Sequence, residues 1–249
     1  MRTVLVTGGA KRLGRLVALA AARDGWDVVL HHHDSVEDSE ATCREVRALG
    51  RRCATVRADL GSEAEVRALV GEAAAAIGGP VTGLVNSASR FQWDDAAGLT
   101  LDGFAGHAAV NAFAPARLAS DLAAQLPEGA EGSVVNLLDF KLANPDPDYF
   151  SYSVSKYALQ GATRLLARAL APRVRVNAVA PGYMLPAPGQ DEAEFQRLAA
   201  RTPLGRPADA EDVARAVVFL LGNRSATGQE IALDCGLHFL ARDRDVGLA

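Results

Sequence analysis

Several features that mark other classes of protein are absent from this 249-residue sequence. No run reaches the roughly 18 consecutive apolar residues of a membrane-spanning helix, and the opening residues show no apolar signal core followed by a small-residue cleavage site. Basic residues are scattered and the formal net charge is −4, which argues against a nucleic-acid-binding surface. We therefore expect a cytoplasmic protein with no nucleic-acid and no membrane partner.

Cysteine is scarce as well. The three cysteines, Cys43, Cys53 and Cys235, form no CxxC pair and no metal-ligand spacing, so unbridged thiols in a reducing compartment are the simplest expectation. A run of three histidines, His31 to His33, is the other candidate for metal binding. Because side chains alternate along a strand, the middle histidine points away from its neighbours. No metal site is predicted.

What the sequence does contain is a regular alternation of short β-branched apolar runs with Ala/Leu/Arg-rich segments of helical periodicity. The apolar runs predict strands at 3–7, 26–31, 53–58, 81–86, 133–138, 174–179 and 230–234, and the helical segments lie near 13–24, 36–49, 62–77, 100–126, 150–170 and 209–222. Continuously apolar strands are typical of a parallel sheet that is covered on both faces. We expect one domain over residues 1–249: a Rossmann-like, doubly wound α/β sheet of seven parallel strands with helices on both faces.

The one irregular stretch is 181–190, which holds three prolines and two glycines before another polar helical segment. It is interpreted as a substrate lid over about 181–200, because long irregular loops on a rigid scaffold often carry function. The closing segment, 227–234, is expected to form an edge strand of the sheet.

Two segments point to a dinucleotide. The glycine-rich segment 7–14 follows the first strand and opens the first helix, where backbone N–H groups and the helix dipole can hold a pyrophosphate. Residues His31 to Ser35 follow the second strand, where dinucleotide enzymes distinguish a ribose hydroxyl from a 2′-phosphate.

Three side chains point to acid–base chemistry. Tyr152 and Lys156 are four residues apart and share one helix face. A phenol with a pKa near 10 needs such a neighbouring cation to act as a base at neutral pH. Asp139 precedes Tyr152 by thirteen residues, the spacing at which short-chain dehydrogenases, which this pattern resembles, carry a catalytic serine. The resemblance thus implies a carboxylate beside the phenol, which would raise the pKa of the phenol. That direction suits a proton donor, although it also fits a scaffold that has lost activity.

These motifs, in this order, resemble the short-chain dehydrogenase/reductase family from Thr3 to about Gly236. The segment TGGAKRLG, the segment LVNSASRF at 84–91 and an aspartate at position 139, in place of the catalytic serine of ordinary members, resemble the pteridine reductase branch (dihydropterin or dihydromonapterin reductases). The resemblance implies NADPH as cofactor, with NADH less favoured, and a homotetramer. Arg12 stands where the middle glycine is usual. Asp34 replaces the branch's arginine, and its charge would repel a 2′-phosphate.

The resemblance also implies a set of site residues. Catalysis is expected from Asp139, Tyr152, Lys156 and Asn111, the last steadying a proton-relay water. Cofactor contacts are expected from Gly8, Lys11, Arg12, Leu13, Gly14, His31, His33, Ser35, Asp59, Leu60, Asn86, Ala88, Tyr152, Lys156, Pro181 and Gly182. Substrate contacts are expected from Ser89, Phe91, Asp139 and Tyr152, with Phe91 stacking on a flat heterocycle.

Alternatives remain open for several of these residues and for the function. Asn111 can equally be a buried helix amide, and Phe91 can simply pack on the lid. The favoured function is an NADPH-dependent reductase of a pterin or dihydrofolate-like heterocycle, which takes its proton from tyrosine and aspartate. The alternatives are a carbonyl reductase of the 3-oxoacyl type on the same scaffold and a nucleotide-binding protein without turnover. The sequence does not specify the physiological substrate.

Overall fold

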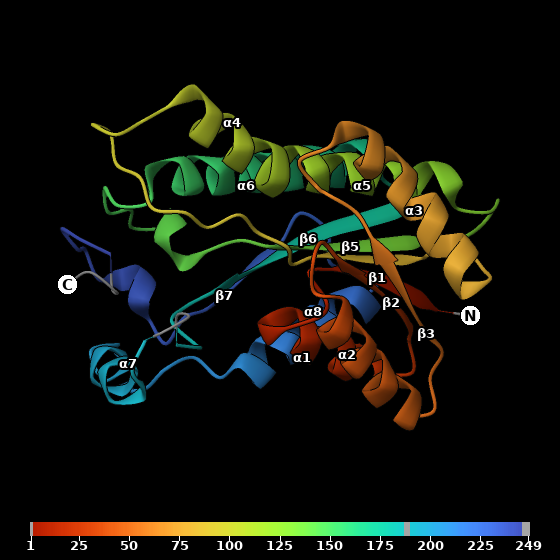
Figure 1. The fold of residues 1–249 in the computed structure, drawn as a ribbon, viewed down its shortest axis with the longest axis horizontal. Helices are drawn as coiled ribbons and strands as arrows, with labels where there is room; N and C mark the ends of the chain where they lie inside the picture. Colours follow the sequence, from red (N-terminus) through yellow and green to blue (C-terminus); the bar gives the residue numbers. More distant parts are fainter. Residues whose placement is uncertain (1, 187–189, 246–249) are drawn as a thin grey trace.

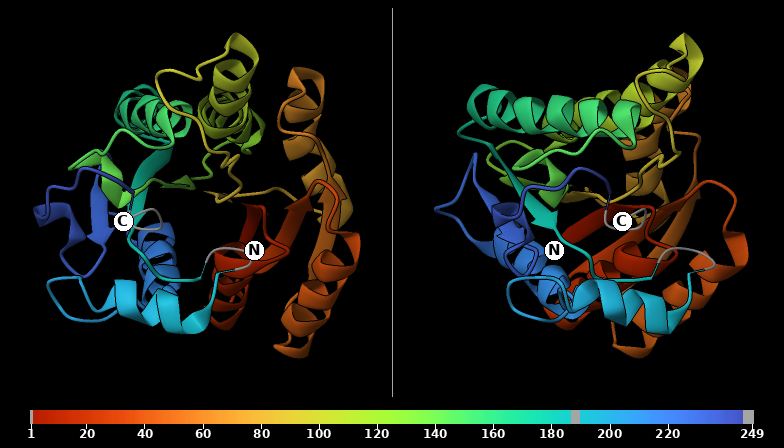
Figure 2. Two further views of the ribbon diagram at one scale, coloured as in Figure 1. Left: turned by 60° about the vertical axis from the view of Figure 1, so that its left-hand side comes forward. Right: turned by 90° about the vertical axis from the view of Figure 1, so that its left-hand side faces the viewer.

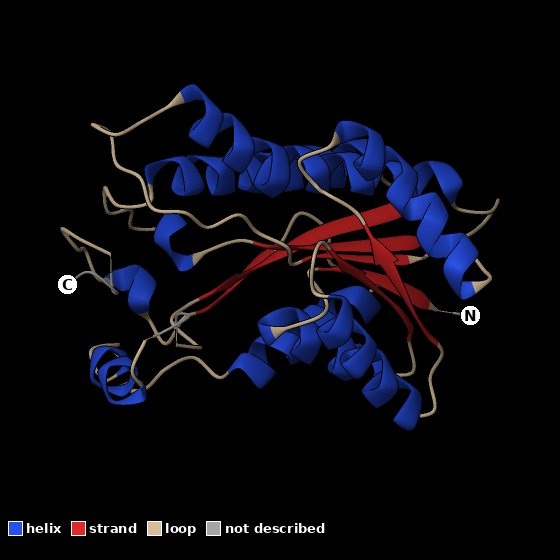
Figure 3. Cartoon of the chain, viewed as in Figure 1, coloured by secondary structure: helices blue, strands red, loops and turns tan. Residues whose placement is uncertain are grey.

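A single parallel sheet runs through the molecule between two layers of helices (Figures 1 and 3). The computed structural model describes residues 2–186 and 190–245. Its seven strands are β1 (Thr3–Thr7), β2 (Asp27–His32), β3 (Cys53–Arg57), β4 (Gly83–Asn86), β5 (Gly132–Leu137), β6 (Val174–Pro181) and β7 (Glu230–Leu233). They are ordered β3-β2-β1-β4-β5-β6-β7, and every neighbouring pair is parallel. The predicted fold class is confirmed.

The helices divide between the two faces of the sheet, as both views of Figure 2 show. One face carries α1 (Arg12–Arg23), α2 (Val36–Ala48) and α8 (Ala210–Gly222), and the other carries α3 (Glu63–Ile77), α5 (Ala114–Gln125) and α6 (Phe150–Ala169). Side chains alternate along β1 and so enter the hydrophobic cores on both faces of the sheet: Val4 and Val6 pack toward α1, whereas Leu5 packs toward α3. This two-sided burial explains why the strands are apolar along their whole length.

The segment predicted as helical over 100–126 is less regular than expected. It consists of α4 (Leu101–Ala108), a π-helical turn η1 (Ala109–Phe113) and α5. Such wide turns cost helical regularity and often lie at functional sites. Pro115, which has no N–H to donate to the carbonyl four residues earlier, follows directly after this turn.

The lid segment is only partly described. Residues 181–186 leave the end of β6, and the polar helix α7 (Glu192–Ala199) follows. The part at 187–189 lies outside the described residues. Two 3₁₀ turns complete the chain, η2 (Phe140–Leu142) after β5 and η3 (Leu237–Phe239) after β7.

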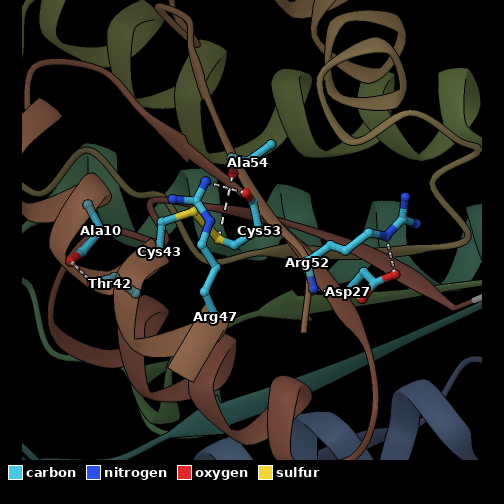
Figure 4. Close-up of a disulfide and its surroundings, with 8 residues drawn as sticks. All are labelled: Ala10, Asp27, Thr42, Cys43, Arg47, Arg52, Cys53 and Ala54. Carbon is cyan, nitrogen blue, oxygen red and sulfur yellow. Dashed lines mark hydrogen bonds and ion pairs between the residues drawn. A yellow bond between two sulfur atoms is a disulfide. The ribbon is translucent and has the colours of Figure 1, made fainter. Parts of the chain in front are cut away.

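The expectation of three unbridged thiols is wrong. Cys43, on α2, forms a disulfide with Cys53, the first residue of β3, and their Cα atoms are 5.5 Å apart (Figure 4). The ten-residue separation spans the second half of α2 and the turn after it, so the helix folds back over the start of the strand. A search for CxxC or metal-ligand spacing cannot detect a pairing that depends on this packing. Cys235 is free.

Strand β7 forms one edge of the sheet, as expected from the sequence, and its residues are exposed or half-buried in alternation. Over residues 2–186 and 190–245, no helix combines the length and the apolar character that a membrane span requires.

Candidate active site

A cleft of about 420 Å³ opens at the carboxyl ends of β1, β4, β5 and β6. The strand order reverses between β1 and β4, and ligands of open α/β sheets bind at such a switch point. Predicted site residues that line the cleft are Gly8, Lys11, Arg12, Leu13, Gly14, Ala88, Ser89, Phe91, Asp139, Tyr152, Lys156, Pro181 and Gly182, and they are joined by Ser87, Leu137, Leu138 and Met184. The nucleotide motif and the acid–base motif therefore meet in one place.

The glycine-rich turn is shaped by backbone constraints at three positions. Gly8 has a φ of +63°, and a Cβ there would lie 3.0 Å from the Cα of Ala88. A Cβ on Gly14 would collide with the carbonyl oxygen of Gly8. Arg12 has a φ of +50°, which costs about 1–2 kcal/mol for a residue with a side chain. This conformation explains why glycine is usual at the position of Arg12.

Two side chains hold the turn in place. The Thr7 hydroxyl accepts hydrogen bonds from the backbone N–H groups of Ser87 and Ala88 at 3.0 and 3.1 Å, which ties the turn to the loop after β4. His31 lies buried behind the turn. Its Nδ1 accepts from the N–H of Gly8 at 3.2 Å, so the proton resides on Nε2, which lies 3.0 Å from the carbonyl of Ala58.

Burial lowers the pKa of His31 to about 4, since it penalises the charged form more than the carbonyl of Ala58 favours it. The ring is therefore neutral at physiological pH. In this state it supports the glycine-rich turn from behind.

The other predicted cofactor residues lie outside the cleft lining. Asp59 and Leu60 follow β3 and Asn86 ends β4, where its Nδ2 donates to Asn136 at 2.8 Å in the interior. Ser35 caps α2. His33 is exposed and pairs with Asp34 at 3.1 Å, and Lys11 pairs with Asp38 at 2.7 Å.

Tyr152 and Asp139 form the central contact of the cleft. The phenol of Tyr152, on α6, donates to Oδ2 of Asp139 at 2.6 Å, and Oδ1 of Asp139 accepts from the backbone N–H of Lys141 at 2.9 Å. Burial raises the pKa of Tyr152 well above 10, and the carboxylate of Asp139 is the second largest cause of this shift. Burial also raises the pKa of Asp139, against the hydrogen bond from Tyr152. The phenol is thus protonated at neutral pH, as a proton donor must be.

Lys156 lies one helical turn beyond Tyr152 and is buried. Its Nζ donates to the carbonyl of Leu137 at 2.8 Å and lies 5.6 Å from the centre of the Tyr152 ring. Burial lowers the pKa of Lys156 to about 8, and the charge of Asp139 opposes this shift. The ammonium form prevails at neutral pH.

Asn111, in the π turn, uses all four hydrogen-bonding capacities of its side-chain amide. Its Oδ1 accepts from the N–H of Arg90 and the hydroxyl of Ser89, and its Nδ2 donates to the carbonyl of Arg90 and the hydroxyl of Ser155. A relay water beside this residue would therefore have to bond to its backbone carbonyl. His107 makes a second clamp, because its Nε2 accepts from the N–H of Gln92 at 3.3 Å.

The residues that Asn111 and His107 hold, Arg90 and Gln92, lie on either side of Phe91 in the sequence. The ring of Phe91 is 53% exposed, and it stacks on Tyr149 with centroids 4.2 Å apart and an interplanar angle of 15°. The ring of Tyr152 meets it edge-on at 4.7 Å. Phe91 is thus a fixed aromatic surface beside the proton donor, and one of its faces is already covered by Tyr149.

Comparison with known proteins agrees with this arrangement. Residues 8–238 match the sequence family described as enoyl-(acyl carrier protein) reductase. The chain belongs to the short-chain dehydrogenase/reductase family. Among curated relatives, a protein assigned as ketoacyl reductase 2 of the granaticin polyketide synthase of Streptomyces violaceoruber is 34% identical, with 95% of this chain and 96% of the relative covered. The 3-oxoacyl-[acyl-carrier-protein] reductase of Staphylococcus aureus is 29% identical, with 95% and 98% covered.

Solved structures of the family are also similar. The FolM alternative dihydrofolate reductase 1 of Brucella canis, crystallised with NADP, is 41% identical and superposes with a TM-score of 0.90 over 96% of this chain and 95% of that one. A short-chain dehydrogenase of Burkholderia cenocepacia, also with NADP, is 34% identical with a TM-score of 0.85 over 94% and 97%.

Sequence reasoning missed four residues that shape the cleft of this family member: Thr7, His107, Lys141 and Tyr149. Thr7 lies within the glycine-rich motif, but its hydrogen bonds depend on the position of Ser87 and Ala88 in the loop after β4. The other three lie in no recognisable motif. Their roles follow from contacts that only the folded chain creates.

Proposed function

We propose that this chain is an NADPH-dependent reductase of a dihydropterin or dihydrofolate-like heterocycle. The observation that carries the proposal is the 2.6 Å hydrogen bond from Tyr152 to Asp139, because a carboxylate occupies the place where ordinary members of the family carry a ketone-activating serine. A protonated phenol backed by a carboxylate suits proton donation to a ring nitrogen. The similarity to FolM alternative dihydrofolate reductase supports the same choice.

The residues present fit a dinucleotide. The turn from Gly8 to Gly14 lines the cleft at the N-terminus of α1, where such folds bind a pyrophosphate, and the absence of side chains at Gly8 and Gly14 lets the turn pack against Ala88 and on itself. Arg12 would contact phosphate oxygens, and His33 and Ser35, which follow β2, would contact a 2′-phosphate. When bound, the reduced nicotinamide supplies the hydride. The NADP in the similar structures supports this cofactor.

The chain's own residues then have separate tasks. Tyr152 donates its proton to the substrate, and the Lys156 ammonium offsets the charge that remains on the phenolate. Asp139 orients the phenol, and the backbone carbonyl of Asn111 holds a water that returns a proton. Phe91, which is exposed, offers an aromatic surface to a flat ring.

A second candidate, a 3-oxoacyl-type carbonyl reductase, is favoured by the curated relatives, which are named as ketoacyl reductases. A nucleotide-binding protein without turnover is the third, and the assembled Tyr152, Lys156 and Asp139 argue against it.

The decisive assay follows NADPH oxidation by absorbance with dihydrobiopterin, with an acetoacetyl thioester and with neither. We expect turnover with the dihydropterin at least tenfold above that with the thioester, measured as kcat/KM. Turnover of the thioester alone would favour the carbonyl reductase. A protein that binds NADPH and turns over neither substrate would support the third candidate.

A further inference from the structure

A buried ammonium lies next to the cleft without lining it. Lys141, in η2 directly after Asp139, is 3% exposed. Its Nζ lies 2.8 Å from Oδ1 of Asp146 and 3.0 Å from Oδ2 of Asp245, and it donates to the carbonyl of Asp148 at 3.0 Å. The ammonium therefore joins the loop after β5 to the C-terminal segment, which is 104 residues away in the sequence.

The C-terminal segment is held at a second point. Oδ2 of Asp148 accepts from Nε of Arg244 and from the backbone N–H of Asp245, both at 2.8 Å. The contact between Arg244 and Asp148 is an ion pair, and the hydrogen bond from the guanidinium of Arg244 lowers the pKa of Asp148. Figures 1 and 2 show the dark blue end of the chain beside the green segment after β5, and η2 contacts η3.

Lys141 reaches the cleft through two further contacts. Its backbone N–H donates to Oδ1 of Asp139, the carboxylate that accepts from Tyr152. Its Nζ lies 5.3 Å from the centre of the Tyr149 ring, which stacks on Phe91. One residue is thus linked to the C-terminal segment, to the proton-donating pair and to the aromatic surface.

This cluster combines two cations with three carboxylates, of which Lys141, Asp146 and Asp148 are buried whereas Arg244 is exposed. Buried ion pairs are a poor way to gain stability, because desolvation opposes the attraction between charges. Such clusters are better suited to fixing one geometry. The cluster of Lys141, Asp146, Asp148, Arg244 and Asp245 links the loop at 139–149 to the C-terminal segment, and this loop carries both Asp139 and Tyr149.

We propose that Lys141 is a positioning residue, which uses its ion pair with Asp245 of the C-terminal segment to hold Asp139 and the Tyr149–Phe91 stack in place for a flat substrate. The proposal rests on the proposed function for the identity of the substrate. It assigns the C-terminal segment a share in substrate affinity although the described residues of that segment, up to Asp245, do not line the cleft.

The test compares Asp245→Asn and Lys141→Met with wild type. Arg224→Gln is the matched control, since it removes an exposed ion pair with Glu131 at 2.9 Å that lies away from the cleft. Asp245→Asn is expected to raise KM for dihydropterin at least fivefold, with kcat and the NADPH dissociation constant within twofold of wild type. Amide hydrogen exchange in peptides covering 139–149 should quicken at least tenfold. Lys141→Met should raise both KM and the exchange rate by more than Asp245→Asn does. Arg224→Gln should change neither KM nor the exchange rate.

The double variant separates a shared contact from two independent defects. If both residues act through one ion pair, adding Asp245→Asn to Lys141→Met leaves KM close to that of Lys141→Met alone. Additive effects, or wild-type KM and exchange in Asp245→Asn, would overturn the proposal. If the wild type does not reduce dihydropterin, the proposed function fails, whereas hydrogen exchange, which needs no substrate, still decides the role of Lys141.

Discussion

Three single residues distinguish this chain from the family pattern: Arg12, in a left-handed conformation at the glycine-rich turn, Asp139 beside the phenol, and Asp34, which follows β2 and lies outside the cleft lining. Arg12 adds a cation where glycine is usual, and Asp34 adds an anion close to where a 2′-phosphate would lie. The pairing of Asp34 with His33 at 3.1 Å offsets this anion whenever the imidazole is protonated.

We therefore expect Asp34 to weaken the preference for NADPH over NADH. We predict that the wild type prefers NADPH over NADH, and that Asp34→Arg increases the ratio of the two kcat/KM values about tenfold, because a repulsive charge becomes an attractive one. Steady-state kinetics with both cofactors and one substrate measure this ratio. An unchanged ratio would show that Asp34 does not face the 2′-phosphate.

At the scale of elements, the sequence predicted all seven strands to within two residues at each end, because a buried parallel strand must be a short β-branched run. The sequence could not predict the π turn, nor which backbone groups the side chains of Asn111 and His107 hold. Asn111 and Arg90, or His107 and Gln92, meet only after α4 packs against the β4 loop. The pair Tyr152 and Lys156 was predictable because local helix geometry alone places both on one face.

His31 links β2 to the glycine-rich turn through its hydrogen bond with Gly8, and its titration makes the free energy of unfolding depend on pH. The pKa of His31 falls from about 6.5 in the unfolded chain to about 4 in the fold, so the unfolded state binds the proton first. The free energy of unfolding should be at its plateau above pH 6.5 and decrease as the pH falls toward 4, by an amount on the order of 3 kcal/mol.

Urea unfolding across this pH range tests the assignment. His31→Gln should remove most of the slope. Equal slopes in His31→Gln and wild type would assign the pH dependence to other groups.

At the scale of the whole molecule, the disulfide between Cys43 and Cys53 is the feature that no sequence pattern predicted. We predict that denaturation without reductant exposes one thiol to alkylation, on Cys235, and that reduction exposes three. The ten-residue loop implies that replacing both bridged cysteines with serine lowers the free energy of unfolding by about 2–3 kcal/mol. Mass spectrometry of the alkylated protein gives the count, and three labelled thiols without reductant would contradict the bridge.

The edge strand β7 leads to a prediction about assembly. An exposed edge is usually protected by pairing or covering, and closed symmetric oligomers are the common means. We predict a homotetramer, about four times the chain mass of 26.1 kDa by light scattering at micromolar concentration. A mass near 26.1 kDa would rule it out.

The central claim is that the pair Tyr152–Asp139 makes this family member a reductase of a heterocycle. The most direct measurement is kcat/KM for dihydropterin in Asp139→Ser, with the NADPH dissociation constant measured alongside. The account predicts a loss of at least tenfold, about 1.4 kcal/mol of transition-state stabilisation, with cofactor binding unchanged, whereas Tyr152→Phe abolishes turnover of every substrate. Dihydropterin turnover at the wild-type rate in Asp139→Ser would contradict it.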